Sequence, residues 1–519
     1  MVVNYTVIKE AYNAILLGTK TIEIRLDNQK KLEVGDHICF RELNGTRQLF
    51  VYVDRVICFD NIDTLLSTID DRFCKFYPYD TYQNILKKEF FGETYGKRVR
   101  AIFFHAVKLS IVMPCYNGIP YICETLDSLC KQKYMDYELF FMDDGSTDST
   151  EMLVESFVER IPIHYVKSQH SGPARLRTKG LKMSNAEFIV FLDSDDLFES
   201  DYLQEMVKTL ESSSADIAIA EFDSFDTEEG YCICPVPLFE DEFLKKSMNS
   251  KFQWKEIPDY FRHWTNVPWN KMYRRDFLLR INAFFQELPC SNDVYFSHYT
   301  MCNGSILHIN STKAMVHYRI GRKTSISDKH DYFSEIKAYD KICEDLKWVD
   351  ELTKEKIYDD FLAGIMKCLR WGSGALHKEF FDTVQKEILE EHIHIPGDYL
   401  RKRYSWLIKI FETSDYGDEI YRVNYQILKL ANLKTEEIKI LFEQLSSISG
   451  VGVLRLNRDI QYLRKQFEVC PIQWVEAEQW RDIKPEICLC CSALQLTELG
   501  SFIRDNGLVK QKFIPLFCM

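Results

Sequence analysis

The clearest hydrophobic pattern lies in residues 108–230, where short apolar runs alternate with amphipathic stretches. Runs of five or six apolar residues, such as residues 188–192, have the length of strands that are buried on both faces. The stretches between them, which begin near Pro120, Ser149 and Pro173, carry apolar residues at helical spacing. This alternation predicts an α/β fold with a mostly parallel sheet covered by helices on both faces.

The segments on either side follow other patterns. Residues 1–107 contain short alternating apolar runs, which are typical of a small β-rich domain with one or two helices. Residues 231–330 are irregular and rich in aromatic residues, and we assign them to the central domain. Helical periodicity then predicts a helical extension at residues 331–440, and β-α-β order predicts a small α/β domain at residues 441–519. The predicted domains are therefore 1–107, 108–330, 331–440 and 441–519.

Composition limits the class of protein. A chain of 519 residues is too long for a single compact core, so we expect several domains. A content of 46% apolar and 28% charged residues is typical of a folded soluble protein. We expect no transmembrane segment, because no apolar run reaches about 18 residues. No signal-peptide pattern opens the chain, and 17 scattered cysteines suggest a reducing compartment, so we expect a cytoplasmic protein. The net charge of −13 argues against extended nucleic-acid binding by the whole chain.

Carboxylates crowd at the ends of the predicted central strands, where open α/β sheets bind their ligands. One strand ends at Asp143 and Asp144, and another ends at Asp193, Asp195 and Asp196. Like charges this close cost folding energy unless a cation offsets them. A hard divalent ion, Mn²⁺ or Mg²⁺, would do so and would also bind the oxygens of a diphosphate. The alternative for such a cluster is a turn followed by a helix N-cap.

Six motifs, in this order and spacing, resemble the family 2 glycosyltransferases of GT-A fold. Each of the first three contains a predicted strand and the polar loop that follows it. They read SIVMPCYNGIPYICETLDSLCKQ, YELFFMDDGSTDST and AEFIVFLDSDDLF. The other three read PWNKMYRRDFL, SNDVYFS and VHYRIGRKTSIS. The resemblance spans about 220 residues. It implies a GT-A nucleotide-diphospho-sugar transferase fold, a nucleotide-sugar donor such as a UDP-sugar, and a glycan or lipid-linked glycan acceptor. A lipid-linked acceptor would place the enzyme at the inner face of the membrane.

The resemblance implies a nucleotide-binding role for residues at the first and second strand ends. Asp144, together with Asp143, would contact the base or ribose of a nucleotide such as uridine. Pro114 and Tyr116 would form the wall beneath that base, and ordinary packing is the alternative for Tyr116. Asp193 would assist through the ribose.

The same resemblance implies a metal site and a general base. Asp195 would be the main metal ligand, assisted by Asp196, and His317 would complete the metal shell unless it is structural. Asp293 would be the general base that removes a proton from the acceptor hydroxyl. Attack from the face opposite the leaving diphosphate would invert the anomeric configuration. Trp269 would line the sugar or acceptor cleft, with core packing as the alternative.

Two motifs depart from the family pattern. Arg177 would help to neutralise the leaving diphosphate, but it lies in LRTKG where the family usually has A-R-N-x-G. Asn292 stands where the family commonly has Glu, which is the second departure.

Arg319, Arg322 and Lys323 would close over the diphosphate. The favoured function is an inverting, metal-dependent hexosyltransferase; the alternatives are a catalytically impaired nucleotide- or RNA-binding regulatory protein and a structural hub.

The flanking segments show further resemblances. Residues 15–40 resemble the ASCH domain, a small β-barrel related to RNA-binding PUA folds. The matching residues are Gly18, Lys20, Thr21, Glu23, Arg25 and the Val34-Gly35-Asp36 turn. RNA or nucleotide binding through Lys20, Glu23 and Arg25 is one hypothesis, and a salt-bridged strand is the other. Residues 441–519 resemble degenerate Rossmann-like units, and because a G-x-G-x-x-G loop is missing we expect no bound NAD.

Overall fold

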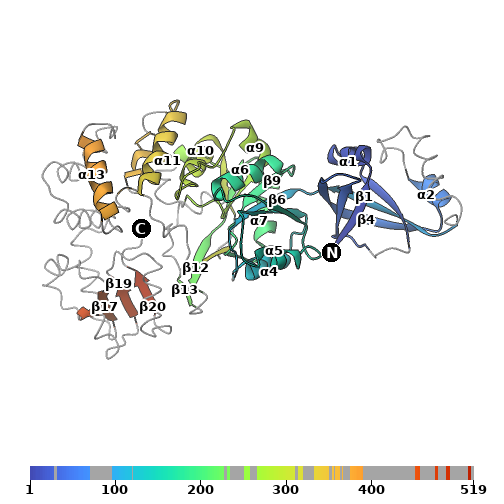
Figure 1. Cartoon of the computed structure of the whole chain (residues 1–519), viewed down its shortest axis with the longest axis horizontal. Coiled ribbons are helices and arrows are strands. Elements are labelled where there is room, and N and C mark those ends of the chain that lie inside the picture. The colour runs from blue at the N-terminus through green and yellow to red at the C-terminus, as the bar shows by residue number, and fades with distance from the viewer. Residues whose placement is uncertain are drawn as a thin grey trace.

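The computed structural model describes most of residues 1–349 and shorter parts of the chain beyond them (Figure 1). Up to residue 349 the segments left out are 28–31, 70–95, 120, 227–230, 234–249, 257–265, 310–313 and 320–331. Beyond that point the described residues lie within 354–389 and in the four strands 451–455, 474–476, 487–490 and 512–515. Most of the predicted helical extension lies outside the described residues, as do the stretches between the four C-terminal strands, where the expected β-α-β order requires its helices. Arg322 and Lys323 also lie outside them.

The N-terminal part of the chain forms a five-stranded sheet in the order β1-β3-β4-β5-β2. Its strands are β1 (Val2–Val7), β2 (Ile22–Leu26), β3 (His37–Glu42), β4 (Gln48–Phe59) and β5 (Val99–Ala106). β1 pairs parallel with β3, and the other pairs are antiparallel. Helix α1 (Lys9–Leu16) buries its apolar face on this sheet, and helix α2 (Ile62–Thr68) begins at the cap of Asn61. The β-rich character expected here is confirmed; the ASCH resemblance stays a prediction.

The central sheet has seven strands in the order β15-β11-β14-β9-β6-β7-β8. The strands are β6 (Leu109–Cys115), β7 (Tyr137–Asp143), β8 (Ile163–Lys167), β9 (Phe188–Phe191), β11 (Ile217–Ile219), β14 (Lys271–Arg274) and β15 (Ile306–His308). Every residue of β6, β7 and β9 is buried, as the uninterrupted apolar runs predict. Only the described pairings of β14, with β9 and β11, are antiparallel, which confirms a mostly parallel sheet.

Helices cover both faces of this sheet because successive strand residues point to opposite sides. Ile111 and Met113 of β6 belong to a core cluster with helices α4 (Ile122–Cys130) and α7 (Tyr202–Glu211). Val112 belongs to a second cluster, with helices α6 (Pro173–Met183), α9 (Arg275–Arg280) and α10 (Val294–Asn303). Gly180 lets α6 approach β6, since a Cβ there would collide with the side chain of Val112.

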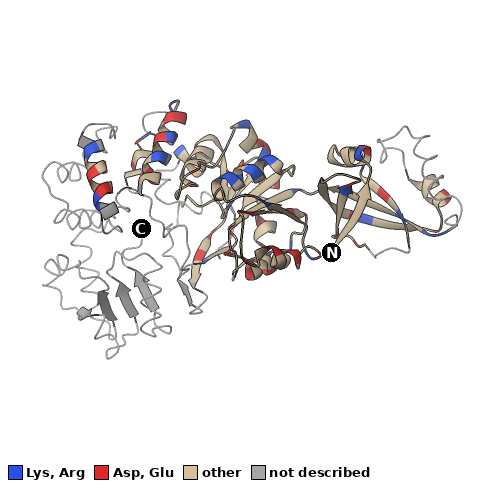
Figure 2. Cartoon of the chain, in the orientation of Figure 1, with Lys and Arg blue, Asp and Glu red and all other residues tan. Residues whose placement is uncertain are grey.

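The two layers of helices differ in charge. Figure 2 shows acidic residues on α4 and on α5 (Thr150–Glu155) and basic residues on α6 and α9. The exposed residues of α6 include Arg175, Lys179 and Lys182, and no acidic residue lies in that helix. The net negative charge of the chain therefore conceals a basic face over one side of the central sheet.

A second, smaller sheet lies beside the carboxylate-rich strand end, in the order β10-β16-β12-β13. Its strands are β10 (Leu197–Phe198), β12 (Phe222–Asp226), β13 (Tyr231–Ile233) and β16 (Val316–Arg319). β10 follows Asp196 directly, and Leu197 pairs with His317 of β16. This pairing brings two sequence motifs that lie about 120 residues apart into one layer.

The remaining described elements are helices and a parallel sheet. Helices α11 (Tyr332–Asp345) and α13 (Ala375–Leu389) contact each other, and α11 packs on α10. Strands β17 (Val451–Arg455), β18 (Trp474–Glu476), β19 (Ile487–Cys490) and β20 (Lys512–Pro515) form a parallel sheet in the order β18-β17-β19-β20. These four strands agree with the strands that the β-α-β order expected for residues 441–519 requires. Among the described residues, no helix is long and apolar enough to cross a membrane.

Two neighbouring leucines of α9 provide a test of the central core. Leu278 is fully buried, whereas Leu279 is 40% exposed. We expect Leu278→Ala to lower the free energy of unfolding by about 2–5 kcal/mol, because it leaves a cavity. The same change at Leu279 should stay within about 0.5 kcal/mol. Denaturant unfolding of both variants measures the difference, and equal effects would contradict this packing.

The N-terminal sheet contacts the central sheet through a histidine and two carboxylates. His105 of β5 donates to Asp136 (Nε2 to Oδ2, 2.7 Å) and to Asp54 (Nδ1 to Oδ1, 2.8 Å). The other oxygen of Asp136 accepts a hydrogen bond from the backbone of Lys108 (3.0 Å), two residues beyond the end of β5. Nearby, Gln48 of β4 donates to His164 of β8 (3.2 Å), and His164 donates to the buried Glu138 (2.7 Å). Polar side chains therefore join the two sheets.

This contact predicts a pH-dependent stability. The hydrogen bond to Asp136 raises the pKa of His105 to about 9. Because the pKa of His105 is raised in the folded protein, its protonated ring contributes to the free energy of unfolding. This contribution is complete below the pKa of histidine in the unfolded chain, about 6.5, and is lost as the pH rises through 9. Because 34% of the side chain is exposed, screening by water reduces the contribution to roughly 1–2 kcal/mol. We expect His105→Gln to lower the free energy of unfolding by that amount at pH 6 and to have no effect at pH 10.

The two carboxylates offer a matched control for this prediction. Asp136 is 10% exposed and Asp54 is 46% exposed. Asp136→Asn should therefore flatten the pH dependence more than Asp54→Asn. If the free energy of unfolding of the His105→Gln variant depends on pH in the same way as that of the unmodified protein, the protonation of His105 does not contribute to stability.

Candidate functional site

The loops after β6, β7 and β9 meet at one edge of the central sheet. Asp144, just after β7, donates its backbone N–H to the carbonyl of Cys115 at the end of β6 (2.8 Å). Asn117, which has a φ of 51°, accepts a hydrogen bond from the backbone of Thr147 (2.9 Å). Thr125 of α4 donates to the carbonyl of Ser194 in the third loop (3.1 Å). The three polar strand ends that the sequence predicts to lie together are thus brought together.

The carboxylates of Asp143 and Asp144, at the end of β7, both accept hydrogen bonds from neighbouring protein groups. The carboxylate of Asp143 is buried and accepts from the Ser146 backbone (2.8 Å) and from the hydroxyl of Tyr165 (2.6 Å). The carboxylate of Asp144 accepts from the backbones of Ser171 (2.7 Å) and Gly172 (2.9 Å). Asp143 therefore shapes the loop, while Asp144 fastens the loop that precedes α6.

The aromatic surface predicted beneath a nucleotide base is present only in part. The Tyr116 side chain is 50% exposed, and its ring lies 4.5 Å from the ring of His170. His170 contacts the carboxylate of Asp144 (2.9 Å). Tyr116 and His170 thus form an exposed aromatic pair beside Asp144, the type of surface on which a base stacks. Pro114 instead lies buried within β6, paired with Met142 of β7.

The third strand end is held down by β16. Arg319 donates its backbone N–H to Asp196 (2.9 Å) and its Nε to the carbonyl of Asp195 (2.6 Å). Its guanidinium also pairs with Glu124 of α4 (2.7 Å) and is 1% exposed. The sequence suggested that Arg319 closes over a diphosphate. In the structure, Arg319 instead holds the loop of residues 193–196 in place, because its guanidinium is buried and contacts that loop.

Asp196 is a fully buried carboxylate of the site, as is Asp143. One oxygen of Asp196 accepts from Arg319, and Oδ2 has no hydrogen-bond partner. Burial, and after it the charge of Asp193, raise the pKa of Asp196 well above its usual value. A buried carboxylate oxygen without a partner is costly and marks a position where a cation would be stabilised.

Arg177 joins the third strand end to the α10 motif. Its guanidinium donates to Asp193 (2.5 Å) and to the side-chain oxygen of Asn292 (3.1 Å), and the residue is 6% exposed. The guanidinium also lies over the ring of Phe285, 5.4 Å from its centre. Asn292, the departure from the family pattern, is therefore a neutral partner of Arg177, and Asp193 is the carboxylate that pairs with this cation.

Asp293 is the residue before α10 and is only partly exposed. Desolvation raises the pKa of its carboxyl group, while the nearby charges of Arg177 and Lys271 lower it. A carboxylate whose pKa lies above its ordinary value accepts a proton more readily near neutral pH. Asp193 also acts on this pKa, so the third strand end and Asp293 belong to one electrostatic site.

His317 contacts two carboxylates that are not among the predicted metal ligands. Its Nδ1 contacts Asp223 (2.6 Å) and its Nε2 contacts Glu199 (3.2 Å), and these contacts raise its pKa. Both ring nitrogens are thus engaged, so metal binding would require one of these contacts to break. Within the described residues, no group of three or more His, Cys, Asp and Glu side chains is arranged to hold a metal ion. The oxygen donors of Asp195 and Asp196 still suit Mg²⁺ or Mn²⁺ chemically.

Some residues of the site were missed or misjudged from the sequence. Trp269 is 2% exposed and stacks on Tyr318 (5.5 Å between centroids), so it is a core residue. The contacts of His170 and of Lys271 were not predicted. A polar residue inside an apolar motif, as in PWNK, was the available signal for Lys271.

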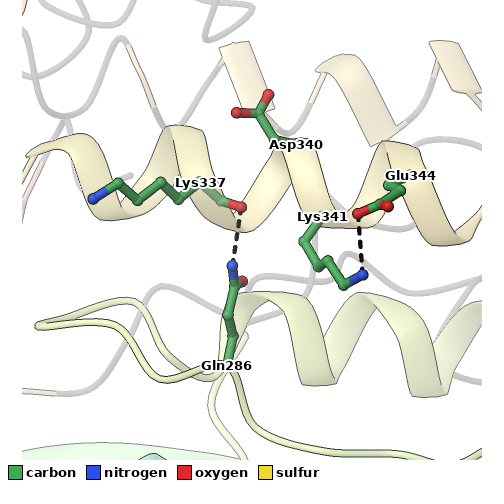
Figure 3. A pocket seen from close by; sticks show the side chains of 5 residues that line it. All are labelled: Gln286, Lys337, Asp340, Lys341 and Glu344. Atoms are coloured by element: carbon green, nitrogen blue, oxygen red, sulfur yellow. Dashed lines mark hydrogen bonds and ion pairs between the residues drawn. The ribbon is translucent and has the colours of Figure 1, made fainter.

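A hollow of about 310 Å³ between α11 and the segment before α10 lies outside this constellation (Figure 3). Its lining residues are Gln286, Lys337, Asp340, Lys341 and Glu344. Lys341 pairs with Glu344 (3.1 Å), and Gln286 donates to the carbonyl of Lys337 (3.1 Å). Because its polar groups contact one another and include no residue of the strand-end loops, we do not count it as part of the site.

Comparison with known proteins bears on this site. Residues 110–280 match the family model described as Glycosyl transferase family 2. Glycosyltransferase GlyA of Streptococcus pneumoniae is 33% identical over 124 residues, 24% of this chain and 18% of GlyA. The poly(ribitol-phosphate) beta-N-acetylglucosaminyltransferase TarS of Staphylococcus aureus is 25% identical over 214 residues, 40% of this chain and 35% of TarS. The crystal structure of TarS gives a TM-score of 0.46 at 20% identity, covering 61% of this chain and 54% of TarS. The chain therefore spans well under half the length of these two curated relatives.

Proposed function

Residues 110–280 form a family 2 glycosyltransferase domain, and from this we propose that the protein transfers a sugar from a nucleotide-diphosphate donor to a glycan or lipid-linked glycan acceptor. One observation carries the proposal. It is that Asp144 follows β7 and Asp193 and Asp195 follow β9, on either side of β6 at one edge of the sheet, and that Arg177 joins this edge to the motif of Asp293. Such an arrangement suits a ligand with a base at one end and a diphosphate at the other.

A UDP-sugar is the proposed donor. Its base would stack on the exposed ring of Tyr116, and Asp144 would accept a hydrogen bond from the base or ribose. Binding would require His170 and the backbone of Ser171 to share the Asp144 carboxylate with the nucleotide. A relative named as a beta-N-acetylglucosaminyltransferase, TarS, makes an N-acetylhexosamine the first sugar to test.

Divalent metal binding at Asp195 and Asp196 is part of the proposal. Mn²⁺ or Mg²⁺ at these carboxylates would neutralise negative charge on the diphosphate as it leaves. Arg319 would keep the loop of Asp195 and Asp196 in place, since its backbone and guanidinium both hold that loop. Arg177 would keep Asp193 oriented toward the ribose.

Asp293 is the proposed general base. Its carboxylate would take the proton of the acceptor hydroxyl as that oxygen forms a bond to the anomeric carbon. The bond from the anomeric carbon to the diphosphate oxygen breaks on the opposite face, and the electron pair leaves with the nucleoside diphosphate. The sugar is therefore transferred with inversion, and the enzyme forms no covalent bond to it.

The experiment that tests the proposal has two stages. A thermal-shift panel of nucleoside diphosphates and UDP-, GDP- and dTDP-sugars with Mn²⁺ should show one preferred donor, because a ligand that binds the folded state raises its unfolding temperature. Release of the nucleoside diphosphate in the presence of glycan acceptors should then follow for that donor. Binding without turnover over a broad acceptor panel would favour a nucleotide-binding regulatory protein. Binding of no nucleotide would leave a structural role.

RNA or nucleotide binding by the N-terminal sheet remains a separate hypothesis. Glu23 pairs with Lys20 (3.0 Å) and with Arg25 (2.7 Å), and Lys20 and Glu23 are each 10% exposed. Glu23 offsets one of the two positive charges, and the side chains of Lys20 and Glu23 are mostly buried, which favours the salt-bridged strand. Gel-shift titration with short RNAs, compared between the protein and its Lys20→Ala variant, decides between the two.

A further inference from the structure

The carboxylate of Asp144 is already occupied by donors of the protein. Its side chain is 4% exposed, and Oδ1 accepts from the backbone N–H and the hydroxyl of Ser171 (2.7 and 3.3 Å). Oδ2 accepts from the backbone N–H of Gly172 (2.9 Å) and from Nδ1 of His170 (2.9 Å). A carboxylate has about four acceptor positions, and all of them are used here. A nucleotide base could therefore contact Asp144 only in place of one of these donors.

The ring of His170 lies exposed beside this carboxylate. Its side chain is 65% exposed, and within the described part of the chain its Nε2 has no hydrogen-bond partner. The centre of the ring lies 4.5 Å from that of Tyr116, which is 50% exposed. The two rings belong to different loops, one after β6 and one after β8. A flat ligand stacked on Tyr116 would thus lie next to a ring nitrogen that is available for a hydrogen bond.

The contact with Asp144 fixes which nitrogen of His170 carries the hydrogen. An ionised carboxylate can only accept, so Nδ1 is the donor of this pair. The backbone carbonyl of Asp144 lies 3.3 Å from the same nitrogen and is a second acceptor there. In the neutral ring the hydrogen is therefore on Nδ1, and Nε2 presents its lone pair to the solvent. Nε2 is a hydrogen-bond acceptor at the place where a base would lie.

The loop that carries His170 is held on both sides of the ring. Before it, Ser168 donates its backbone N–H to the carbonyl of Asp143 (2.8 Å), and after it the next two residues donate theirs to Asp144. Gly145 has a φ of 81°, and a Cβ there would lie 3.1 Å from the carbonyl oxygen of Ser168 and 3.4 Å from the backbone nitrogen of His170. Glycine thus lets the two loops approach each other. A group held in place before binding loses little freedom when a ligand arrives, which favours a specific contact.

We propose that His170 reads the base of the nucleotide donor: its Nε2 accepts a hydrogen bond from the ring N–H on the pairing edge of a base stacked on Tyr116. Uracil and thymine carry this hydrogen on N3 and guanine carries it on N1. Cytosine and adenine have a lone pair at the corresponding nitrogen, so two acceptors would face each other and neither would be satisfied. The inference rests on the proposed function, because it requires a nucleotide at this edge of the sheet. Asp144 then acts on the base through His170, and a direct contact of Asp144 is left to the ribose.

Other roles for the same residues predict different results. If Asp144 contacts the base directly, removal of the His170 ring frees an acceptor position on Asp144, and uridine nucleotides should bind more tightly. If the ring only supports Tyr116, every nucleotide should lose affinity by the same factor. The ratio of the affinities for two bases therefore reports on base recognition by His170, whereas the affinity for one nucleotide does not.

The test is calorimetric binding of UDP, CDP and N3-methyl-UDP to the whole chain with Mn²⁺ at pH 8, where histidine rings are neutral. The unmodified protein should bind UDP about tenfold more tightly than the other two, because they leave Nε2 without a donor. In His170→Phe, which keeps an aromatic ring beside Tyr116, UDP affinity should fall about tenfold and equal that for CDP. In His170→Gln the two affinities should also be equal, because the amide can turn either its oxygen or its nitrogen to the base.

A matched control and a folding check accompany these variants. Gln169 is the exposed neighbour of His170 in the same loop, and Gln169→Ala should keep the preference for UDP. The ring of His170 is exposed, and Asp144 keeps its donors from Ser171 and Gly172 in both variants. Both should therefore unfold at nearly the same temperature as the unmodified protein.

The outcomes separate this inference from the proposed function. If no nucleotide binds, the proposed function fails and the role of His170 fails with it. If UDP binds and its sugar is transferred, but the preference for UDP over CDP survives in His170→Phe and His170→Gln, only the role of His170 is overturned. Tighter UDP binding in His170→Phe would assign base recognition to Asp144 and overturn it as well. Equal affinities of the unmodified protein for UDP and CDP would have the same consequence.

Discussion

Asp293→Asn is expected to lower the rate of sugar transfer by about 10²–10⁴-fold, the usual contribution of a positioned general base. The asparagine keeps the size and the position of the residue before α10 but cannot accept the proton. Donor affinity should change little, because the base would act on the acceptor hydroxyl. Initial rates of nucleoside diphosphate release, with donor binding measured separately by calorimetry, test both parts.

A matched control for this prediction lies on α9. Asp276 is exposed and far from the strand-end loops in the chain, so Asp276→Asn should leave transfer and donor binding unchanged. A variant of Asp293 that retains more than a tenth of the original rate would remove Asp293 as the base. Equal loss of donor binding would instead show that it contributes to the donor site.

Asp195→Asn is expected to reduce metal-dependent transfer at least about 100-fold, since a metal ion contributes several kcal/mol to stabilising a leaving diphosphate. Removal of divalent ions with EDTA should have a similar effect on the unmodified protein, and added Mn²⁺ should reverse it. In the variant, the Mn²⁺ concentration for half-maximal rate should rise sharply. Full activity in EDTA would overturn the metal-dependent proposal.

Two further variants show which side chains belong to the metal shell. Asp127→Asn on α4 alters an exposed ion pair with Arg160 and should leave the Mn²⁺ dependence unchanged. His317→Gln tests the predicted third ligand. Because both ring nitrogens of His317 contact Asp223 and Glu199, we expect no change in the Mn²⁺ midpoint. A raised midpoint would place His317 in the shell after all.

The asparagine at position 292 matters for how the site is charged. Arg177 donates to Asn292 and Asp193 and lowers the pKa of Asp293. A glutamate at 292 would compete for the same guanidinium and leave less of its charge for Asp193 and Asp293. The departure from the family pattern is therefore compatible with a working base, because the neutral amide leaves the arginine charge to the two aspartates.

The sequence by itself determined the strands and the acidic strand ends. Apolar runs such as those of β6, β7 and β9 predict strands buried on both faces, and parallel strands bring their carboxyl ends to one edge. That local pattern is sufficient to predict that Asp144, Asp193 and Asp195 lie at the same edge of the sheet. The mostly parallel sheet and its two helical layers followed from the same spacing.

Only the tertiary structure decided which partner each charged side chain has. Asp143 contacts Tyr165 of β8, Arg177 contacts Asn292, and Arg319 contacts the backbone of residue 195, across separations of 22, 115 and 124 residues. Apolar periodicity carries no information about such pairs, because hydrogen bonds and ion pairs depend on distances of a few ångströms that are set when sheets and helices pack. The same reason explains why His317 was expected among the metal ligands but lies between Asp223 and Glu199.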